Sequence, residues 1–281
     1  MKTIAVIGAG TMGSGIAQAC AAAGLTVRLY DQDHTLALKA LQAIRQQMDI
    51  QVSKGKINSN TADEVIKAIS VARTIDETPA DLVIEAVAEN LAIKQSVFAS
   101  LERINAPDTP LTSNTSSLSV TAIASTLKHP ERFAGLHFFN PAPVMKLVEI
   151  VYSPGTAENT LTVLQQFCRT INKHPVTVQD SPGFIVNRVA RPFYLESLRL
   201  LEEGIADARS IDTLLRTTGF RMGPFELMDL IGLDVNLAVS QSLYTAFDNT
   251  PRFRPSTTQE RKVDAGELGR KTGKGFYEYE K

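Results

Sequence analysis

The chain has 281 residues, of which 43% are hydrophobic and 21% charged, a composition typical of a globular protein with a sizeable core. Its 29 Lys and Arg residues nearly balance its 30 Asp and Glu residues, so the net charge of -1 offers no basic excess for nucleic acid or an anionic membrane. Two cysteines, Cys20 and Cys168, are too few for a disulfide framework and favour a reducing compartment such as the cytoplasm.

The sequence predicts no targeting, membrane or metal-binding segment. It contains no run of about 18 apolar residues, the length that a membrane span needs. The N-terminus, MKTIAVIGAG, has an apolar run too short for a signal peptide. No spacing of His, Cys, Asp and Glu predicts a metal site.

The first two thirds of the chain alternate short apolar runs with longer helical patterns. Strands are predicted over residues 3–7, 26–30, 81–86, 111–114 and 135–139, and helices over residues 12–23 and 91–104. This order predicts an α/β fold, a Rossmann-like doubly wound parallel sheet with helices on both faces. Residues 36–69 are more polar and are predicted to form two long helices, a helical excursion from the sheet.

The last third of the chain shows only helical patterns. Ser181-Pro182-Gly183 predicts a helix start, because a polar cap precedes Pro at the first helical position. A long amphipathic helix is predicted over residues 184–203, and shorter ones from residues 207, 224 and 233. The sequence therefore predicts two domains, a dinucleotide-binding domain of residues 1–181 and an all-helical domain of residues 182–281.

A glycine-rich motif, Gly8-Ala9-Gly10-Thr11-Met12-Gly13, joins the first predicted strand to the first predicted helix. In such a GxGxxG turn the first glycine permits the tight turn, the second lets the backbone approach a pyrophosphate, and the third lets helix and strand pack closely. The helix N-terminus then offers its N–H groups to the phosphates. We therefore predict that this motif binds a dinucleotide through Gly8, Gly10, Thr11, Met12 and Gly13.

Asp31 ends the next predicted strand, about 20 residues beyond the glycines, where a carboxylate can bind a ribose 2′-hydroxyl. The same carboxylate would repel a 2′-phosphate, and the neighbouring Gln32 provides no Arg to accept one. NAD is therefore predicted over NADP. Glu89 and Lys94, after the strand at 81–86, lie where a Rossmann loop meets the nicotinamide half of the cofactor, although a solvated helix start with an acid in its first turn explains them equally well.

His137 and Glu149 lie in two predicted strands, residues 135–139 and 146–152, joined by a turn at 140–145. If the strands are antiparallel and symmetric about Pro143, residue 137 lies opposite residue 149. A buried carboxylate needs a partner, and an imidazole would provide one. The pair then resembles the base and its orienting group in general acid–base catalysis. A structural contact beneath the turn is an equally good interpretation.

Three further groups of polar residues have a structural and a functional interpretation. Residues 113–117, which include Asn114 and Ser116, either cap a helix or present an amide and hydroxyls to a ligand at the carboxyl edge of the sheet. Asn187, one turn into the helical domain, either faces water or points into a cleft between the domains. Lys54 and Lys56 are either a solvated loop or a site for phosphate.

Together these residues resemble the 3-hydroxyacyl-CoA dehydrogenase family in its short monofunctional form. The matching segments run from end to end of the chain: VIGAGTMGSGIA, SNTSSLS at 113–119, GLHFFNPAPVMKLVEI at 135–150, DSPGFIVNR at 180–188, MGPFELMDLIGLD at 222–234 and GRKTGKGFYEY. HFFNP followed by KLVE is far more specific than the glycine motif. One departure is Phe220-Arg221, where many relatives have His-Pro or Tyr-Pro.

The resemblance implies a role for each matching position. His137 would be the base that takes the 3-hydroxyl proton, and Glu149 would orient it. Ser116 and Asn187 would hydrogen-bond the reacting oxygen or the neighbouring carbonyl of the substrate. The other assignments concern ligand binding: Asp31, Glu89, Lys94 and Asn114 to NAD, and Ser53 and Lys54 to the CoA phosphates.

The resemblance further implies an acyl-CoA substrate, a homodimer formed by the helical domain, and NAD-dependent oxidation of (S)-3-hydroxyacyl-CoA to 3-oxoacyl-CoA. Short-chain substrates such as 3-hydroxybutyryl-CoA are expected. Two alternatives remain open: an NAD-dependent dehydrogenase of a small free hydroxy acid, such as a sugar acid or carnitine, and a non-catalytic cofactor-binding protein.

Overall fold

The computed structural model describes residues 1–280, and it divides the chain into two compact units, one of residues Met1–Ser181 and one that begins at Pro182. The first unit is an α/β sheet with its covering helices, and the second is helical. The predicted fold class is therefore confirmed.

Within residues 1–280, eight strands form one sheet in the order β3-β2-β1-β4-β5-β6-β7-β8. The strands are β1 (Thr3–Ile7), β2 (Thr26–Tyr30), β3 (Ile69–Val71), β4 (Leu82–Glu85), β5 (Leu111–Ser113), β6 (Phe133–Phe138), β7 (Leu147–Tyr152) and β8 (His174–Gln179). Neighbouring strands run parallel except β6 and β7, which are antiparallel. The central strands β4, β5 and β6 are buried along their whole length because helices cover both of their faces.

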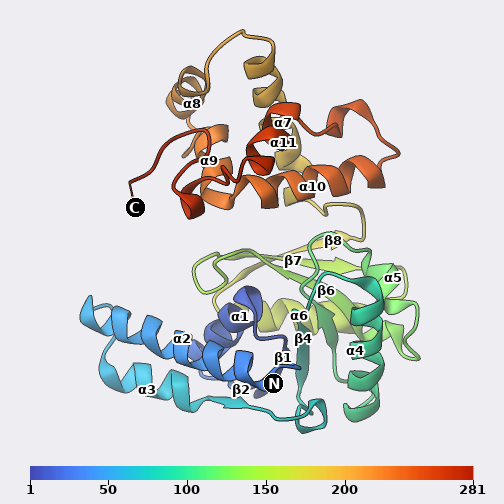
Figure 1. Cartoon of the computed structure of the whole chain (residues 1–281). Helices are drawn as coiled ribbons and strands as arrows, with labels where there is room; N and C mark the ends of the chain where they lie inside the picture. The colour runs from blue at the N-terminus through green and yellow to red at the C-terminus, as the bar shows by residue number, and fades with distance from the viewer. Residues whose placement is uncertain (281) are drawn as a thin grey trace. The chain divides into compact units, whose positions relative to one another are not determined.

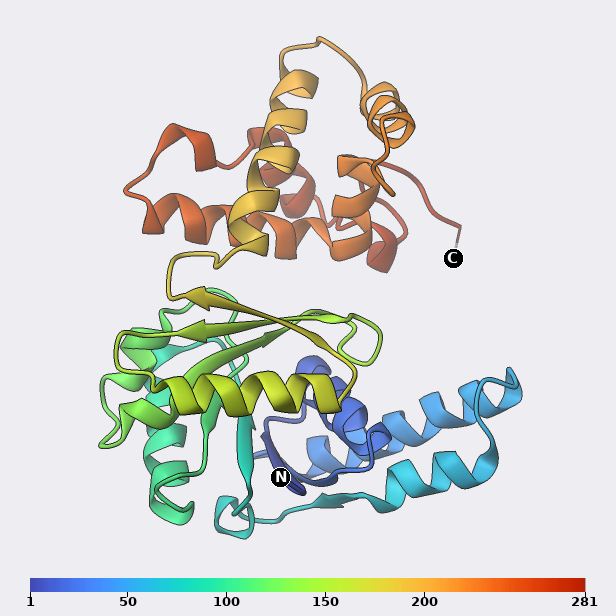
Figure 2. The ribbon, with the colours of Figure 1, turned by 180° about the vertical axis from the view of Figure 1, so that it is seen from behind.

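One face of the sheet packs against α1 (Thr11–Ala22) and α6 (Glu158–Thr170), and the other against α4 (Leu91–Ile104) and α5 (Val120–Ala124), as Figures 1 and 2 show. Alternate residues of β6 serve the two faces. Leu136 joins the cluster that includes Ile16 of α1 and Leu164 of α6, whereas Phe133 packs edge-on against Phe98 of α4 at a ring-centroid distance of 4.8 Å. His137 follows the same alternation and lies on the α4–α5 face.

Two of the strands, β3 and β8, and the helix α6 were not predicted from the sequence. β3 has only three residues, too few for an alternating pattern to register. β8 lies at the edge of the sheet, is largely half-exposed and has Pro175 as its second residue. A proline demotes a strand pattern, yet it is tolerated where a strand has one open edge.

The predicted helical excursion consists of α2 (His34–Ser53) and α3 (Ser59–Lys67). The two helices lie side by side and project from the sheet, with the connection between them at the tip (Figures 1 and 2). Asp33 caps α2 by accepting a hydrogen bond from the Thr35 N–H, and Asn58 caps α3 by accepting one from Thr61.

The second unit contains α7 (Val186–Glu202), α8 (Ala208–Thr217), α9 (Pro224–Ile231), α10 (Leu233–Ala246) and α11 (Thr257–Asp264). Short 3₁₀ helices complete the chain: η1 (Ile75–Glu77) and η2 (Pro130–Arg132) in the first unit, η3 (Pro251–Phe253) and η4 (Arg270–Thr272) in the second. The core of the second unit forms where α7 and α9 meet, around Leu198, Phe225 and Met228.

The predicted start of the long helix was wrong. Helix α7 begins at Val186, and Ser181-Pro182-Gly183 lies in the turn before it. Gly183 has φ +75° and Phe184 has φ +49°, left-handed values that a right-handed helix cannot contain. The Ser-Pro-Gly pattern therefore marks a turn here.

Two buried aspartates hold the glycine-rich tail of the chain in the second unit. Asp229 of α9 accepts hydrogen bonds from the N–H groups of Phe276 and Tyr277, both at 2.9 Å. Asp212 of α8 accepts one from the Tyr277 hydroxyl at 2.7 Å. The matching tail segment, GRKTGKGFYEY, thus has a structural explanation within this unit.

Candidate active site

The glycine motif forms the connection between β1 and α1, and each glycine meets different surroundings. A Cβ at Gly8, where φ is +103°, would lie 2.5 Å from the Ala86 carbonyl oxygen, and one at Gly13 would lie 1.8 Å from the Gly8 oxygen. A Cβ at Gly10 would meet no atom within 4 Å. Gly10 is also the N-cap of α1, which has no side-chain cap, so the first N–H groups of the helix can serve a phosphate. These surroundings fit a dinucleotide.

The contrast between Gly13 and Gly10 predicts two different defects. Gly13→Ala should destabilise the protein by about 3 kcal/mol or more, because the backbone around Gly8 must move. Gly10→Ala should leave stability within about 1 kcal/mol but weaken NADH binding about 10-fold or more, because its methyl group occupies the space of a pyrophosphate. Thermal unfolding and NADH titration of both variants test this. Equal loss of stability in the two would contradict it.

Asp31 follows β2 directly and is tied to the glycine motif. One carboxylate oxygen accepts a hydrogen bond from the Ala9 N–H at 2.7 Å, and the other accepts one from the Asp33 N–H at 3.0 Å. The carboxylate therefore braces the turn beside which a ribose would bind.

His137 and Glu149 are direct partners across the antiparallel pair β6–β7, in the predicted register. The Nδ1 atom of His137 lies 2.8 Å from an Oε atom of Glu149, and the two residues are 5% and 1% exposed. Because a carboxylate only accepts hydrogen bonds, Nδ1 carries the proton of this contact. The geometry is that of an imidazole oriented by a buried carboxylate.

Lys173 stabilises the turn between β6 and β7, and the sequence did not single it out. Its buried ammonium donates hydrogen bonds to the carbonyl oxygens of Ala142 at 2.6 Å and Met145 at 2.7 Å. Burial lowers the pKa of Lys173, and the nearby Lys146 charge lowers it further. The sequence gives no signal of these contacts, because the two carbonyl groups lie 31 and 28 residues from Lys173 along the chain.

The polar residues after β5 are joined to both neighbouring strands. The Asn114 side chain accepts a hydrogen bond from the Phe138 N–H at 2.8 Å, next to His137. Glu89, in the loop after β4, accepts hydrogen bonds from the Thr115 hydroxyl at 2.5 Å and the Ser116 N–H at 3.0 Å. The Asn114, Ser116 and His137 segments are thereby locked together at one edge of the sheet.

Lys94 does not line an open surface in this unit, since it is 1% exposed. Its ammonium lies 2.7 Å from Glu85 and 3.2 Å from Glu89. Burial opposes ionisation of Glu89, but the Lys94 charge and the hydrogen bonds from Thr115 and Ser116 outweigh it and lower the pKa of Glu89. A contact between Lys94 and a cofactor stays a prediction.

Most of the predicted residues therefore gather at the carboxyl edge of the parallel strands, where open α/β folds bind ligands. Most of them follow the strands β1, β2, β4 and β5, and one is the next-to-last residue of β6: the glycine motif, Asp31, Glu89, Asn114 with Ser116, and His137. Ser53 and Lys54 are exposed at the tip of the α2–α3 projection, and Asn187 is the second residue of α7 in the second unit. Their contacts with a substrate stay predictions.

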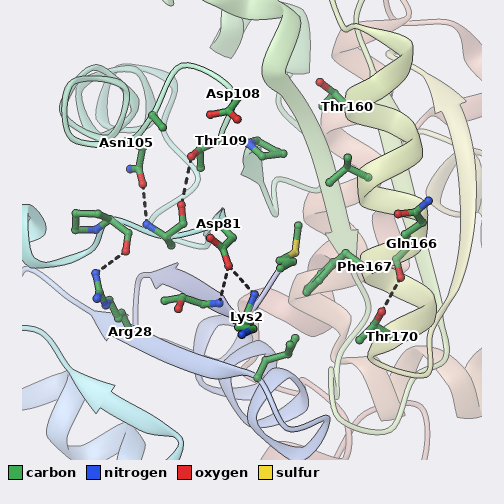
Figure 3. A pocket seen from close by; sticks show the side chains of 18 of the residues that line it. Lys2, Arg28, Asp81, Asn105, Asp108, Thr109, Thr160, Gln166, Phe167 and Thr170 are labelled. Atoms are coloured by element: carbon green, nitrogen blue, oxygen red, sulfur yellow. Dashed lines mark hydrogen bonds between the residues drawn. The ribbon is translucent and has the colours of Figure 1, made fainter.

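A hollow of about 1030 Å³ lies at the opposite edge of the sheet, before the first residues of β1, β2, β4 and β5 (Figure 3). Several of its polar side chains are already paired within the protein. Asp81 accepts hydrogen bonds from the N–H groups of Lys2 and Thr3, and Asn105 accepts one from Ala80. The His137–Glu149 pair lies at the other edge.

The fold and this edge define an NAD-binding dehydrogenase-like protein, and comparison with known proteins gives the family. Residues 3–181 match the model for the NAD-binding domain of 3-hydroxyacyl-CoA dehydrogenase, and residues 183–279 match its C-terminal domain. The chain belongs to the 3-hydroxyacyl-CoA dehydrogenase family, and its first unit is the NAD-binding domain of that family.

Relatives match the chain along its whole length. It is 47% identical to the 3-hydroxyadipyl-CoA dehydrogenase of Escherichia coli over 99% of this chain, but it spans only 59% of that protein. It is 42% identical to the mitochondrial hydroxyacyl-coenzyme A dehydrogenase of Rattus norvegicus, over 99% of this chain and 91% of the relative. The crystal structure of (S)-3-hydroxybutyryl-CoA dehydrogenase from Ralstonia eutropha superposes with a TM-score of 0.94 at 38% identity, covering 100% of both chains.

Proposed function

We propose that this protein is an NAD-dependent 3-hydroxyacyl-CoA dehydrogenase that interconverts (S)-3-hydroxyacyl-CoA and 3-oxoacyl-CoA. The observation that carries the proposal is the buried His137–Glu149 pair at 2.8 Å, at the same sheet edge as the glycine motif. Relatives named for 3-hydroxybutyryl-CoA and 3-hydroxyadipyl-CoA support an acyl-CoA substrate of short to medium length.

In the proposed mechanism bound NAD would supply the acceptor for the hydride that leaves C3 of the substrate. His137 takes the 3-hydroxyl proton on Nε2, the ring nitrogen opposite the one that contacts Glu149. Glu149 orients the ring and stabilises the imidazolium that forms. Ser116 hydrogen-bonds the reacting oxygen, and its hydroxyl is available for this because only its backbone N–H is used within the unit. Asn187 has the same role from the second unit.

The remaining assignments concern the cofactor and CoA. Asp31 binds the adenine ribose and disfavours a 2′-phosphate, with Thr11 and Met12 at the helix end that receives the pyrophosphate. Glu89, Lys94 and Asn114 belong to the nicotinamide side of the site. Ser53 and Lys54 meet the CoA phosphates, which their exposure at the end of α2 supports.

The second unit is proposed to form a homodimer. Large apolar side chains exposed on this unit support the proposal, among them Val189 at 71%, Ile205 at 68%, Leu214 at 65% and Phe220 at 51%. Light scattering that gives the mass of one chain would refute it.

No helix within residues 1–280 has the length and apolar character of a membrane span. The cytoplasm is the proposed location, with two buried thiols whose pKa burial raises to about 12.

Oxidation of NADH by the purified protein tests the proposal, with acetoacetyl-CoA as substrate beside free acetoacetate, and with NADPH in place of NADH. Turnover only with the CoA ester and NADH is expected. Turnover with free hydroxy acids or 3-oxo acids instead would favour the small-acid dehydrogenase. Tight NADH binding without turnover on any acyl chain length would favour a non-catalytic cofactor-binding protein.

A further inference from the structure

Three charged side chains in contact with one another lie beside the proposed active site, two of them buried and the third partly exposed. Glu85, the last residue of β4, is 0% exposed and binds the ammonium of Lys94 at 2.7 Å. That ammonium also lies 3.2 Å from Glu89. We call Glu85, Lys94 and Glu89 the relay. The name describes the series of contacts from Glu85 through Lys94 to Glu89 and the loop 113–117, and not a transfer of charge.

At the inner end of the relay, both carboxylate oxygens of Glu85 accept hydrogen bonds. One oxygen of Glu85 accepts hydrogen bonds from Lys94 and from the Val87 N–H at 2.7 Å, and the other accepts one from the Ser113 hydroxyl at 2.6 Å. Burial raises the pKa of Glu85, although these donors favour its charged form. Removing two charges from water is costly, so a buried pair of this kind contributes little net stability and serves better to fix geometry.

The outer end of the relay holds a loop. A single oxygen of Glu89 accepts hydrogen bonds from the Thr115 hydroxyl, the Ser116 N–H at 3.0 Å, and both the N–H and the hydroxyl of Ser117, at 3.1 and 3.0 Å. The other oxygen faces the Lys94 ammonium. The position of Glu89, and through it that of the Ser116 backbone, therefore depends on where Lys94 is held.

We propose that Lys94, fixed by Glu85, is a positioning residue that sets the place of Ser116 through Glu89. Glu85 was not singled out by the sequence, since a lone carboxylate at the end of an apolar strand shows no pattern of its own. The inference rests on the proposed function in one respect, that the Ser116 hydroxyl binds the substrate oxygen. A misplacement of about 1 Å in such a group is enough to lower a rate strongly.

The test is the variant Glu85→Gln/Lys94→Met, which removes both buried charges while keeping the volume of the side chains. After Glu85→Gln the amide oxygen can still accept from the Val87 N–H, and the amide NH2 can donate to the Ser113 hydroxyl, so the double variant is expected to fold. At saturating NADH, which removes any effect on cofactor affinity, it should lower kcat/KM for acetoacetyl-CoA about 10-fold or more in the wild-type background and hardly at all in a Ser116→Ala background. Hydrogen exchange of the Ser116 and Ser117 amides should become about 10-fold faster or more.

A matched control is Glu102→Gln/Arg132→Met, which removes another poorly exposed pair of the first unit, 3.7 Å apart. It should affect stability alone, with no change in exchange at residues 116 and 117 and no coupling to Ser116→Ala. Should the relay variant fail to fold, Glu89→Gln, whose side chain is 35% exposed, should give the same exchange and the same coupling.

Two results would overturn the inference: unchanged amide exchange in the relay variant, or a loss of kcat/KM that multiplies fully with that of Ser116→Ala. A wild-type protein that turns over no acyl-CoA would instead refute the proposed function. The exchange measurement does not depend on activity, so it still decides whether the relay holds the loop.

Discussion

His137→Gln should lower kcat for acetoacetyl-CoA reduction by about 10²- to 10⁴-fold, the usual contribution of a general acid–base group, while NADH affinity stays within about 2-fold. Gln can still accept a hydrogen bond from the hydroxyl group but cannot exchange its proton with the substrate. The side chain it replaces is 5% exposed and lies beside Phe139, with a ring-centroid distance of 4.5 Å, so the local packing is largely kept.

The same chain offers a matched control in His129, whose Nδ1 lies 3.0 Å from Glu131. That imidazole is 47% exposed and does not belong to the proposed site, so His129→Gln should leave kcat unchanged. Steady-state kinetics and NADH titration of both variants provide the comparison. Normal turnover by a folded His137→Gln protein would remove His137 from the mechanism.

Glu149→Gln should lower kcat on the order of 10²-fold or more, as loss of the carboxylate that orients a catalytic imidazole does in serine proteases. The neutral amide no longer stabilises the imidazolium or selects the Nδ1–H form of the ring. NADH affinity should stay within about 2-fold, because Glu149 acts on the imidazole and not on the cofactor.

The control for this second variant is Glu131→Gln, which removes the carboxylate of the exposed pair. Glu131 is 52% exposed, and both kcat and NADH affinity should stay as in the wild type. Steady-state kinetics at saturating substrate and NADH titration measure the two quantities. A folded Glu149→Gln protein with an unchanged kcat would show that Glu149 does not orient His137 for the reaction.

The sequence was sufficient for those features that depend on local patterns. β1, β2 and α4 have the predicted bounds or nearly so, since apolar periodicity and glycine punctuation decide them. The His137–Glu149 pairing also followed from the sequence, because a short turn between two strands leaves an antiparallel register symmetric about its middle residue. The family could be identified for the same reason, as its specific motifs are short and continuous.

Tertiary structure decided what depends on contacts between distant segments. The sequence around Lys94 is compatible with a solvated residue at a helix start, yet Lys94 is buried and paired with Glu85 and Glu89. Only the parallel pairing of β4 with β5 brings Ser113 to Glu85. Lys173, between α6 and β8, likewise contacts the distant 140–145 turn. Local propensity carries no information about such partners, because a buried charge is stabilised only by groups that folding brings to it. The predicted start of α7 was wrong because Ser-Pro-Gly is compatible with either a helix cap or a turn. The left-handed backbone at Gly183 and Phe184 shows that it is a turn.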